Sequence, residues 1–194
     1  MFSARAKADP EFATRILEQH RNIERVLILI RLQVDSLHTS NRVKDLRFID
    51  RAVVYMTGFP TLVHDPSEEF LFTRLVLRSP ACACLCDRLT RQQSAFSTLS
   101  SSLLGHLRRA QAGDDCAYKS VKQSGIDYCL QYADHIHSEE TDMLPSARRR
   151  LSREDWDSVD QQATEALGND TWPELRSHDS IYDFLMAGEN HHDD

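Results

Sequence analysis

The chain has 194 residues, of which 41% are hydrophobic, and its 30 acidic and 23 basic residues give a net charge of -7. This length and hydrophobic content are typical of one domain with a substantial core. The negative charge provides no field that would hold a polyanion, so we expect no nucleic acid as a partner.

Neither a signal peptide nor a membrane span is expected. Residues 1–10 contain no continuous apolar region, and the longest apolar run, residues 26–30, is too short to cross a bilayer. We therefore expect a cytoplasmic protein without a membrane partner. Its five cysteines include a C-x-C-x-C group at Cys82, Cys84 and Cys86, which differs from the C-x-x-C spacing of zinc sites. They are predicted to be free thiols, with a redox or soft-metal role as the alternative.

Long segments between the few glycines and prolines repeat apolar residues at helical spacing, so the chain is predicted to be all-α. The first helix is expected over residues 10–37, with His20 in its apolar stripe. The second is expected to follow the polar turn at 39–41. It should be kinked or broken at Pro60 and Pro66, because each proline removes a backbone donor.

The remaining elements complete a bundle. Ser79 and Pro80 are predicted to be the N-cap and first residue of a third helix, which ends at Gly113. A fourth helix is expected from about 118 to 143, and a short fifth helix over 152–167. These elements predict an up-down-up-down four-helix bundle with a short added helix.

The bundle domain is predicted to cover residues 10–168. Residues 1–9 form a lead, and residues 169–194 form an acidic C-terminal tail. Part of this tail is expected to dock on the bundle through its aromatic residues, and its end, residues 189–194, is expected to be mobile.

Two His-x-x-x-Glu motifs, His64/Glu68 and His135/Glu139, each place an imidazole and a carboxylate one turn apart on the same helix face. Either motif alone is more typical of an exposed face, because glutamate is seldom buried. Two motifs on separate helices, together with His20 in an apolar stripe, favour a dinuclear metal site inside the bundle.

The surroundings of these motifs resemble the two signature segments of the haemerythrin-like, or HHE cation-binding, domain family. These segments are residues 64–72 (HDPSEEFLF) and 135–145 (HIHSEETDMLP), and the resemblance extends to 17–20 and 151–156. It implies a haemerythrin-like bundle with two non-haem irons that bind oxygen or respond to oxidants and nitric oxide. The nitrogen and oxygen ligands do not by themselves distinguish iron from zinc or manganese.

Carried over by position, the resemblance implies as ligands His20, His64, Glu68, His135 and Glu139. The family's usual histidine in the third helix, a sixth ligand, corresponds here to Gln93. Helix geometry agrees, because the level of the first motif, reflected across the turn near Ser79, falls at about residue 93. His106 lies thirteen residues further on. At 1.5 Å per residue this is roughly 20 Å away, so we interpret His106 as structural or partly exposed.

Two interpretations of Gln93 are open. Its amide oxygen ligates a metal weakly, or one metal keeps an open position filled by water, which favours reactivity. Tyr128 and Tyr132 precede His135 on the same face, where they either reach the metal or a bound ligand, or pack in the core. Asp65 is expected behind the ligands or at the surface.

Three functions are compatible with these residues. The first is a di-iron protein that binds or senses oxygen, nitric oxide or peroxide. The second is a peroxide-decomposing or oxidase-type enzyme with an open iron position at Gln93. The third is a degenerate, metal-poor helical interaction module. Whether the protein is an enzyme is left open, and so is its oligomeric state, a homo-oligomer included.

Overall fold

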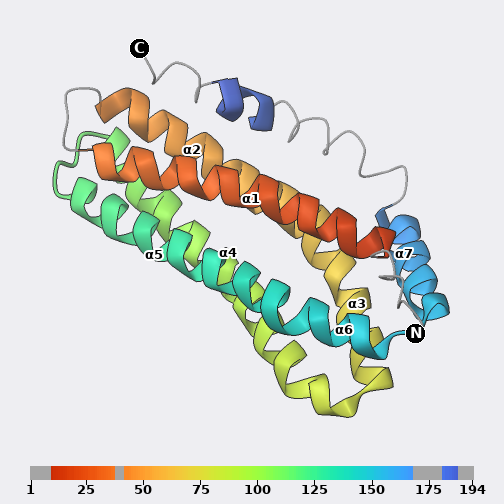
Figure 1. Cartoon of the computed structure of the whole chain (residues 1–194). Coiled ribbons are helices and arrows are strands. Elements are labelled where there is room, and N and C mark those ends of the chain that lie inside the picture. The colour runs from red at the N-terminus through yellow and green to blue at the C-terminus, as the bar shows by residue number, and fades with distance from the viewer. Residues whose placement is uncertain (1–9, 38–41, 168–180, 188–194) are drawn as a thin grey trace, which may run out of the picture.

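Four antiparallel helical rods make up the bundle in the computed structural model, which describes residues 10–37, 42–167 and 181–187 (Figure 1). The rods are α1 (Glu11–Ser36), α2 with η1 and α3 (Arg42–Phe59, Pro60–His64, Asp65–Arg78), η2 with α4 (Pro80–Cys82, Ala83–Gln111), and α5 with η3 and α6 (Ala117–Ser138, Glu139–Met143, Leu144–Arg150). They contact one another in the closed order α1, α2, α4, α5. This confirms the predicted all-α, up-down-up-down bundle.

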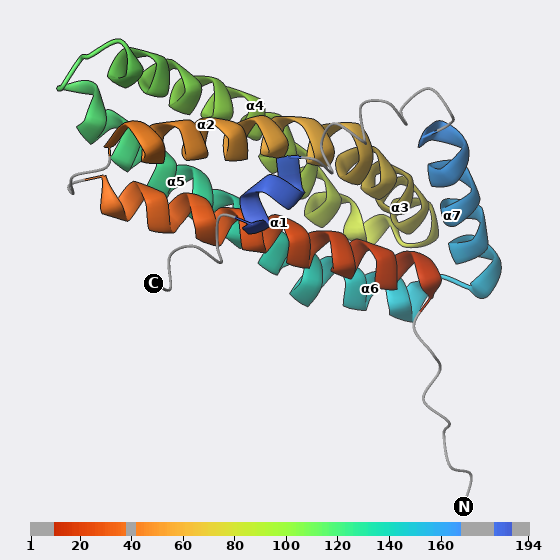
Figure 2. The ribbon, with the colours of Figure 1, turned by 90° about the horizontal axis from the view of Figure 1, so that it is seen from above.

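The predicted fifth helix is α7 (Arg153–Leu167), which packs at one end of the bundle against α3 and α1 (Figure 2). Residues 181–187 form a short helix beside α1 and α2. In it, the Tyr182 hydroxyl donates to Asn22 Oδ1 at 3.1 Å, and Leu185 is fully buried. This part of the predicted tail therefore docks on the bundle. The predicted lead, residues 1–9, and the end predicted to be mobile, residues 189–194, lie outside the described residues.

Buried apolar residues form two clusters with a polar layer between them. One cluster lies toward the α1–α2 and α4–α5 connections and includes Ile23, Leu27, Ile49, Val53, Leu103 and Val121. The other lies toward α7 and includes Phe12, Ile16, Leu71, Leu89, Met143 and Trp156. On α1, His20 lies between Ile16 of one cluster and Ile23 of the other, and it is fully buried. The two clusters thus enclose a polar layer that crosses the bundle.

Two π-helical segments, η1 and η3, interrupt the rods at this layer. In each, the N–H after the segment bonds to the carbonyl five residues back, from Asp65 to Pro60 and from Leu144 to Glu139. In each rod the next residue is a proline, which has no backbone N–H to donate: Pro66 follows Asp65, and Pro145 follows Leu144. The expected kink or break at Pro60 and Pro66 is therefore a π-bulge inside a continuous rod. Such bulges are frequent at functional sites.

Ser79 occupies the predicted N-cap position and Pro80 follows it at the start of the rod, but the cap is not a side-chain one. The Ser79 side chain makes no capping hydrogen bond, and its hydroxyl accepts one from Arg150 Nε at 2.9 Å. The rod begins instead with a 3₁₀ turn, in which the Cys82 N–H donates to the Ser79 carbonyl at 2.9 Å. The turn satisfies backbone groups that a side-chain cap would otherwise satisfy.

The start of α7 is fixed by a capping box. The Asp155 N–H donates to Ser152 Oγ at 3.2 Å, and the Ser152 N–H donates to the Asp155 carboxylate at 3.1 Å. Asp155 is 3% exposed and accepts further bonds from α3, three from Arg78 at 2.8 to 3.0 Å and one from Arg74 at 3.4 Å. The Arg78 guanidinium holds the pKa of Asp155 at about 2. Asp155 therefore both caps α7 and joins it to α3.

We expect Asp155→Ala to lower the free energy of unfolding at pH 7 by about 3 kcal/mol, because Arg78 loses its buried partner and α7 loses its cap. The pKa of Asp155 is depressed from 3.8 in the folded state. Its contribution is therefore present above about pH 4 and is lost as the pH falls toward 2. Denaturant unfolding of both proteins at pH 7 and pH 3 measures the difference. The control is Asp157→Ala, whose side chain is 70% exposed. An equal loss in this control would contradict the assignment.

The membrane prediction can also be compared with the described part of the chain. None of its helices combines the length and the apolar content needed to cross a bilayer.

Candidate metal centre

All five side chains that the sequence singles out as ligands meet in the polar layer. His20 comes from α1, His64 from the end of η1, Glu68 from α3, His135 from α5 and Glu139 from the start of η3. Each is at most 1% exposed. One ligand atom from each of His20, His64, Glu68 and Glu139 lies within 4.8 Å of the others. Both π-bulges thus carry residues of the cluster.

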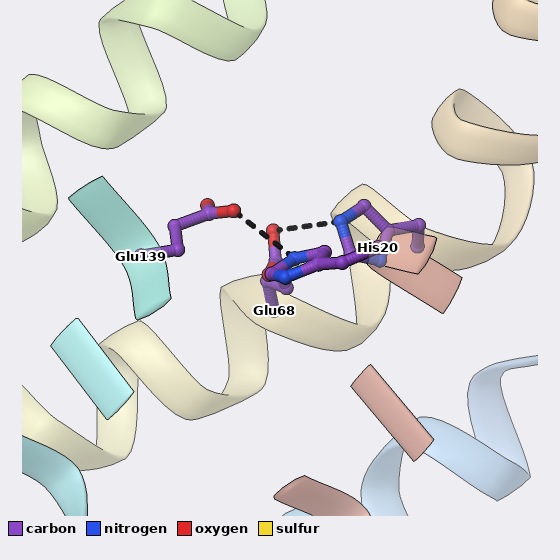
Figure 3. A group of neighbouring side chains, drawn as sticks. His20, Glu68 and Glu139 are labelled. Carbon is purple, nitrogen blue, oxygen red and sulfur yellow. Dashed lines mark ion pairs between the residues drawn. The ribbon is translucent and has the colours of Figure 1, made fainter. Parts of the chain in front are cut away.

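Each glutamate of the cluster lies between two histidines. The Glu68 carboxylate is 3.5 Å from Nε2 of His20 and 3.5 Å from Nε2 of His64. The Glu139 carboxylate is 3.3 Å from Nε2 of His20 and 3.0 Å from Nε2 of His135. Figure 3 shows His20 with its imidazole facing Glu68 and Glu139. His20 therefore links the two His-x-x-x-Glu motifs.

Every histidine of the cluster makes a hydrogen bond through Nδ1 to a side chain outside the cluster. The acceptors are side-chain oxygens, namely Glu140 at 3.0 Å for His20, Gln19 at 3.0 Å for His64 and Gln92 at 3.2 Å for His135. A bond at Nδ1 fixes the ring and leaves Nε2 for the metal, as is usual for histidine ligands. His20 and His64 thus present Nε2 to the same group of ligand atoms, and His135 presents its Nε2 to Glu139 of that group.

The sequence analysis did not identify Gln19, Gln92 and Glu140. Each of these three residues is adjacent in sequence to a residue that the sequence analysis did identify. A hydrogen-bond acceptor next to a predicted ligand position could therefore have indicated them. Their partners, however, lie on other helices. Gln19 of α1 holds His64, and Gln92 of α4 holds the histidine of α5. Helical periodicity alone does not pair residues across helices.

The atoms at the centre of the cluster have no partner with hydrogen-bond geometry among the described residues. They are Nε2 of His20, His64 and His135, Oε1 of Glu68, and both carboxylate oxygens of Glu139. Buried polar atoms are nearly always hydrogen-bonded, and each unsatisfied one costs about 1–3 kcal/mol. Imidazole nitrogens and carboxylate oxygens that converge in this way fit a bound divalent cation.

The buried groups shift one another's pKa values. Burial lowers the pKa of His20, but the carboxylates of Glu139, Glu140 and Glu68 together raise it to about 11. Burial lowers the pKa of His64 to about 4. Burial and the Glu139 carboxylate raise the pKa of Glu68 above its ordinary value. A metal ion has to displace the proton of His20, so metal binding should release protons.

Gln93 lies at the level that helix geometry predicts for it. Its Nε2 donates to Glu68 Oε2 at 2.9 Å, so it reaches the cluster as a donor to a carboxylate. His106 is half-buried and does not join the cluster. Asp65 is also partly buried, and burial together with the Glu68 carboxylate raises its pKa to about 8.

Tyr128 and Tyr132 are both buried in the apolar cluster next to the site. The Tyr132 ring stacks on Phe96 at 3.9 Å between centroids and meets the His135 ring edge-on at 6.4 Å. The Tyr128 ring lies further away, packed against Tyr132 at 5.6 Å. Burial raises the pKa of both tyrosines, so their hydroxyls stay protonated at neutral pH. Tyr132 is the one that shapes the wall beside His135.

The three cysteines of the C-x-C-x-C group do not converge. Cys82 and Cys86 are buried, while Cys84 is exposed. Burial raises the pKa of Cys86 to about 11, which keeps it a thiol and makes it a poor nucleophile and metal ligand. Among the residues that the structure describes, none of these sulfurs joins a cluster of metal-binding side chains.

Comparison with known proteins agrees with this geometry. The hemerythrin HHE cation binding domain family matches residues 12–147. This span contains every residue of the cluster, the elements α2 to η3, nearly all of α1 and the first half of α6. A search of curated proteins finds no match. The matched span covers more than half of the chain, and it brings together the histidines and glutamates of a metal-binding domain. The chain therefore belongs to the hemerythrin HHE cation binding domain family.

Proposed function

We propose that the protein holds two non-haem iron ions between its two His-x-x-x-Glu motifs and binds oxygen, nitric oxide or peroxide there. One observation carries the proposal, namely the six buried nitrogen and oxygen atoms that converge without hydrogen-bond partners. His64 with Glu68 would hold one ion and His135 with Glu139 the other. His20 faces both glutamates and would complete the site.

Side chains around the site would support the binding of such ligands. When bound, iron would supply an electron-rich centre with room for an oxygen-type ligand. The three Nδ1 acceptors hold the imidazoles in place, and the two apolar clusters keep bulk water from the layer. A cytoplasmic location is part of the proposal, since the five cysteines are free thiols and the cytoplasm is reducing.

Absorption spectroscopy tests this function. Protein that has been loaded with ferrous iron under argon should develop a ligand-to-metal charge-transfer band when oxygen or peroxide is admitted, and a different band with nitric oxide. The same protein treated with a chelator is the control and should show neither band. Iron-loaded protein whose spectrum does not respond to any of the three ligands would contradict the proposal.

A second candidate function is decomposition of peroxide, and the position of Gln93 favours it. Because Gln93 donates to Glu68, the described residues supply five ligands, three histidines and two glutamates. An ion with fewer protein ligands keeps a position for a reacting molecule. A metal-poor interaction module is disfavoured, because the unpaired polar atoms of the buried cluster would then have no binding partner.

We expect Gln93→His to lower the rate of peroxide decomposition at least tenfold while leaving the iron content unchanged, because the new imidazole would close the open position. Peroxide consumption per bound iron is the measurement. Gln161→His is the matched control, since Gln161 is exposed on α7. Unchanged turnover in Gln93→His at full iron content would exclude an open position at residue 93.

A further inference from the structure

A pocket of about 530 Å³ lies between the α2–η1–α3 rod and α4, and one end of it is lined by residues that contact or adjoin the metal centre. Gln93, at this end, donates to Glu68. Tyr132 packs beside His135, and Asp65 directly follows His64. Each of these three lining residues thus contacts or adjoins a proposed metal ligand. The pocket therefore adjoins the side of the site where the sixth ligand is missing.

Hydroxyl groups dominate the lining of this pocket. Seven of its fifteen lining residues are serine or threonine, namely Thr57, Thr61, Thr90, Ser94, Ser97, Ser100 and Ser101. An apolar part is formed by Met56, Pro66, Phe96 and Leu104. The acidic lining residues are Asp65 and Glu69, and no basic residue is among the fifteen. Thr57, Ser94 and Ser97 already donate to carbonyls of their own helix, so their hydroxyl oxygens are acceptors. The pocket thus offers neutral hydroxyl groups next to an apolar wall.

The size and charge of the pocket limit what it can bind. Its volume lies within the range of about 300–1,000 Å³ that is typical of pockets for small organic molecules. A diatomic ligand, comparable in size to one water at about 30 Å³, would leave it nearly empty. An anion would meet the carboxyl groups of Asp65 and Glu69 and no basic side chain among the lining residues. A neighbouring pocket that reaches Gln92 is different, because Arg88 and Arg91 line it.

We propose that the pocket beside Gln93 binds a small uncharged hydroxylic molecule with a short apolar end, next to the metal centre. Alcohols and alkyl hydroperoxides share this chemistry. Its hydroxyl would exchange hydrogen bonds with the serine and threonine side chains, and its alkyl part would contact Phe96 and Leu104. The inference deepens the proposed function, on which it rests, by naming the class of molecule that reaches the open position.

Binding can be tested without metal. In ¹⁵N-labelled, metal-free protein, the side-chain NH₂ signals of Gln93, identified by their loss in Gln93→Leu, would report on the end of the pocket beside the metal centre. We expect saturable shifts with tert-butanol, and none with acetate or tetramethylammonium, which are also small. No shift with tert-butanol, or a larger response to either ion, would overturn the proposal.

A pair of variants on α4 tests whether small molecules reach Gln93 through this pocket. Ser97 lines the pocket and Thr98 does not, and both are exposed. We expect Ser97→Trp to abolish the tert-butanol shifts of Gln93 and to slow the reaction of iron-loaded protein with tert-butyl hydroperoxide at least tenfold. Thr98→Trp should match the wild type in both. Equal behaviour of the two variants would overturn the proposal that this pocket is the binding site. Failure of the wild type to bind iron, with the tert-butanol shifts intact, would contradict the metal function alone.

Discussion

Replacing Glu139 by glutamine should abolish metal binding beside His135, so that the proposed two ions per chain fall to one or none after gel filtration. The Glu139 carboxylate faces His20 of one helix and His135 of another, and both of its oxygens lack hydrogen-bond partners. An amide keeps the shape of this side chain, but it replaces one carboxylate oxygen with an NH₂ group and removes the negative charge. Elemental analysis after loading with excess ferrous iron measures the effect.

The neighbouring Glu140→Gln is the matched control. Glu140 accepts from Nδ1 of His20 and therefore acts behind a ligand. Its replacement should weaken metal affinity about 10–100-fold, the usual effect of such a partner, without changing the number of ions bound at saturation. Full loading of Glu139→Gln, or complete loss in Glu140→Gln, would contradict the assignment of Glu139 as the ligand.

Metal-free Glu68→Gln should be more stable than the metal-free wild type by about 2 kcal/mol, because it removes the charge from one of two neighbouring buried carboxylates, Glu68 and Glu139. Burial and the nearby Glu139 raise the pKa of Glu68, which shows that its charged form is disfavoured in the fold. For a chain of this size the gain corresponds to an increase in Tm of roughly 6 °C. Thermal unfolding in the presence of a chelator measures it.

The other glutamate is the control for this prediction. Although burial opposes it, the nearby imidazoles of His135 and His20, at 3.0 and 3.3 Å, lower the pKa of Glu139, so its charged form is favoured. Metal-free Glu139→Gln should therefore be less stable than the wild type, by about 3 kcal/mol. With iron present the wild type should be the most stable of the three, because metal binding stabilises only the folded state. The same change in both metal-free variants would contradict this account.

The sequence was sufficient to predict the rods and the place of most of the site. Helical stripes locate elements well when buried residues recur at a constant spacing, and His20 is conspicuous because it interrupts such a stripe. Its burial, and that of the two His-x-x-x-Glu motifs, follows from their position between apolar residues on both sides. In the structure, ligand atoms of His20, His64, Glu68 and Glu139 lie together, and His135 lies beside Glu139; that these side chains bind metal stays a prediction.

Other features depend on contacts between helices, which spacing does not contain. Pro60 and Pro66 predict a loss of hydrogen bonds, but whether the rod breaks or adopts a π-bulge depends on the neighbouring rods that hold it. The contact of Gln93 with Glu68 likewise depends on a rotamer that only the packed bundle determines. Ser79 has the sequence of an N-cap, yet Arg150 of another rod takes its hydroxyl.

The central claim, two metal ions between the two motifs, is tested most directly by anomalous diffraction from crystals of iron-loaded protein. The account predicts two iron peaks per chain in the polar layer. One should be bonded to His64 and Glu68, the other to His135 and Glu139, and His20 should be bonded to one of them. A single peak, no peak, or iron bound only outside this layer would contradict it.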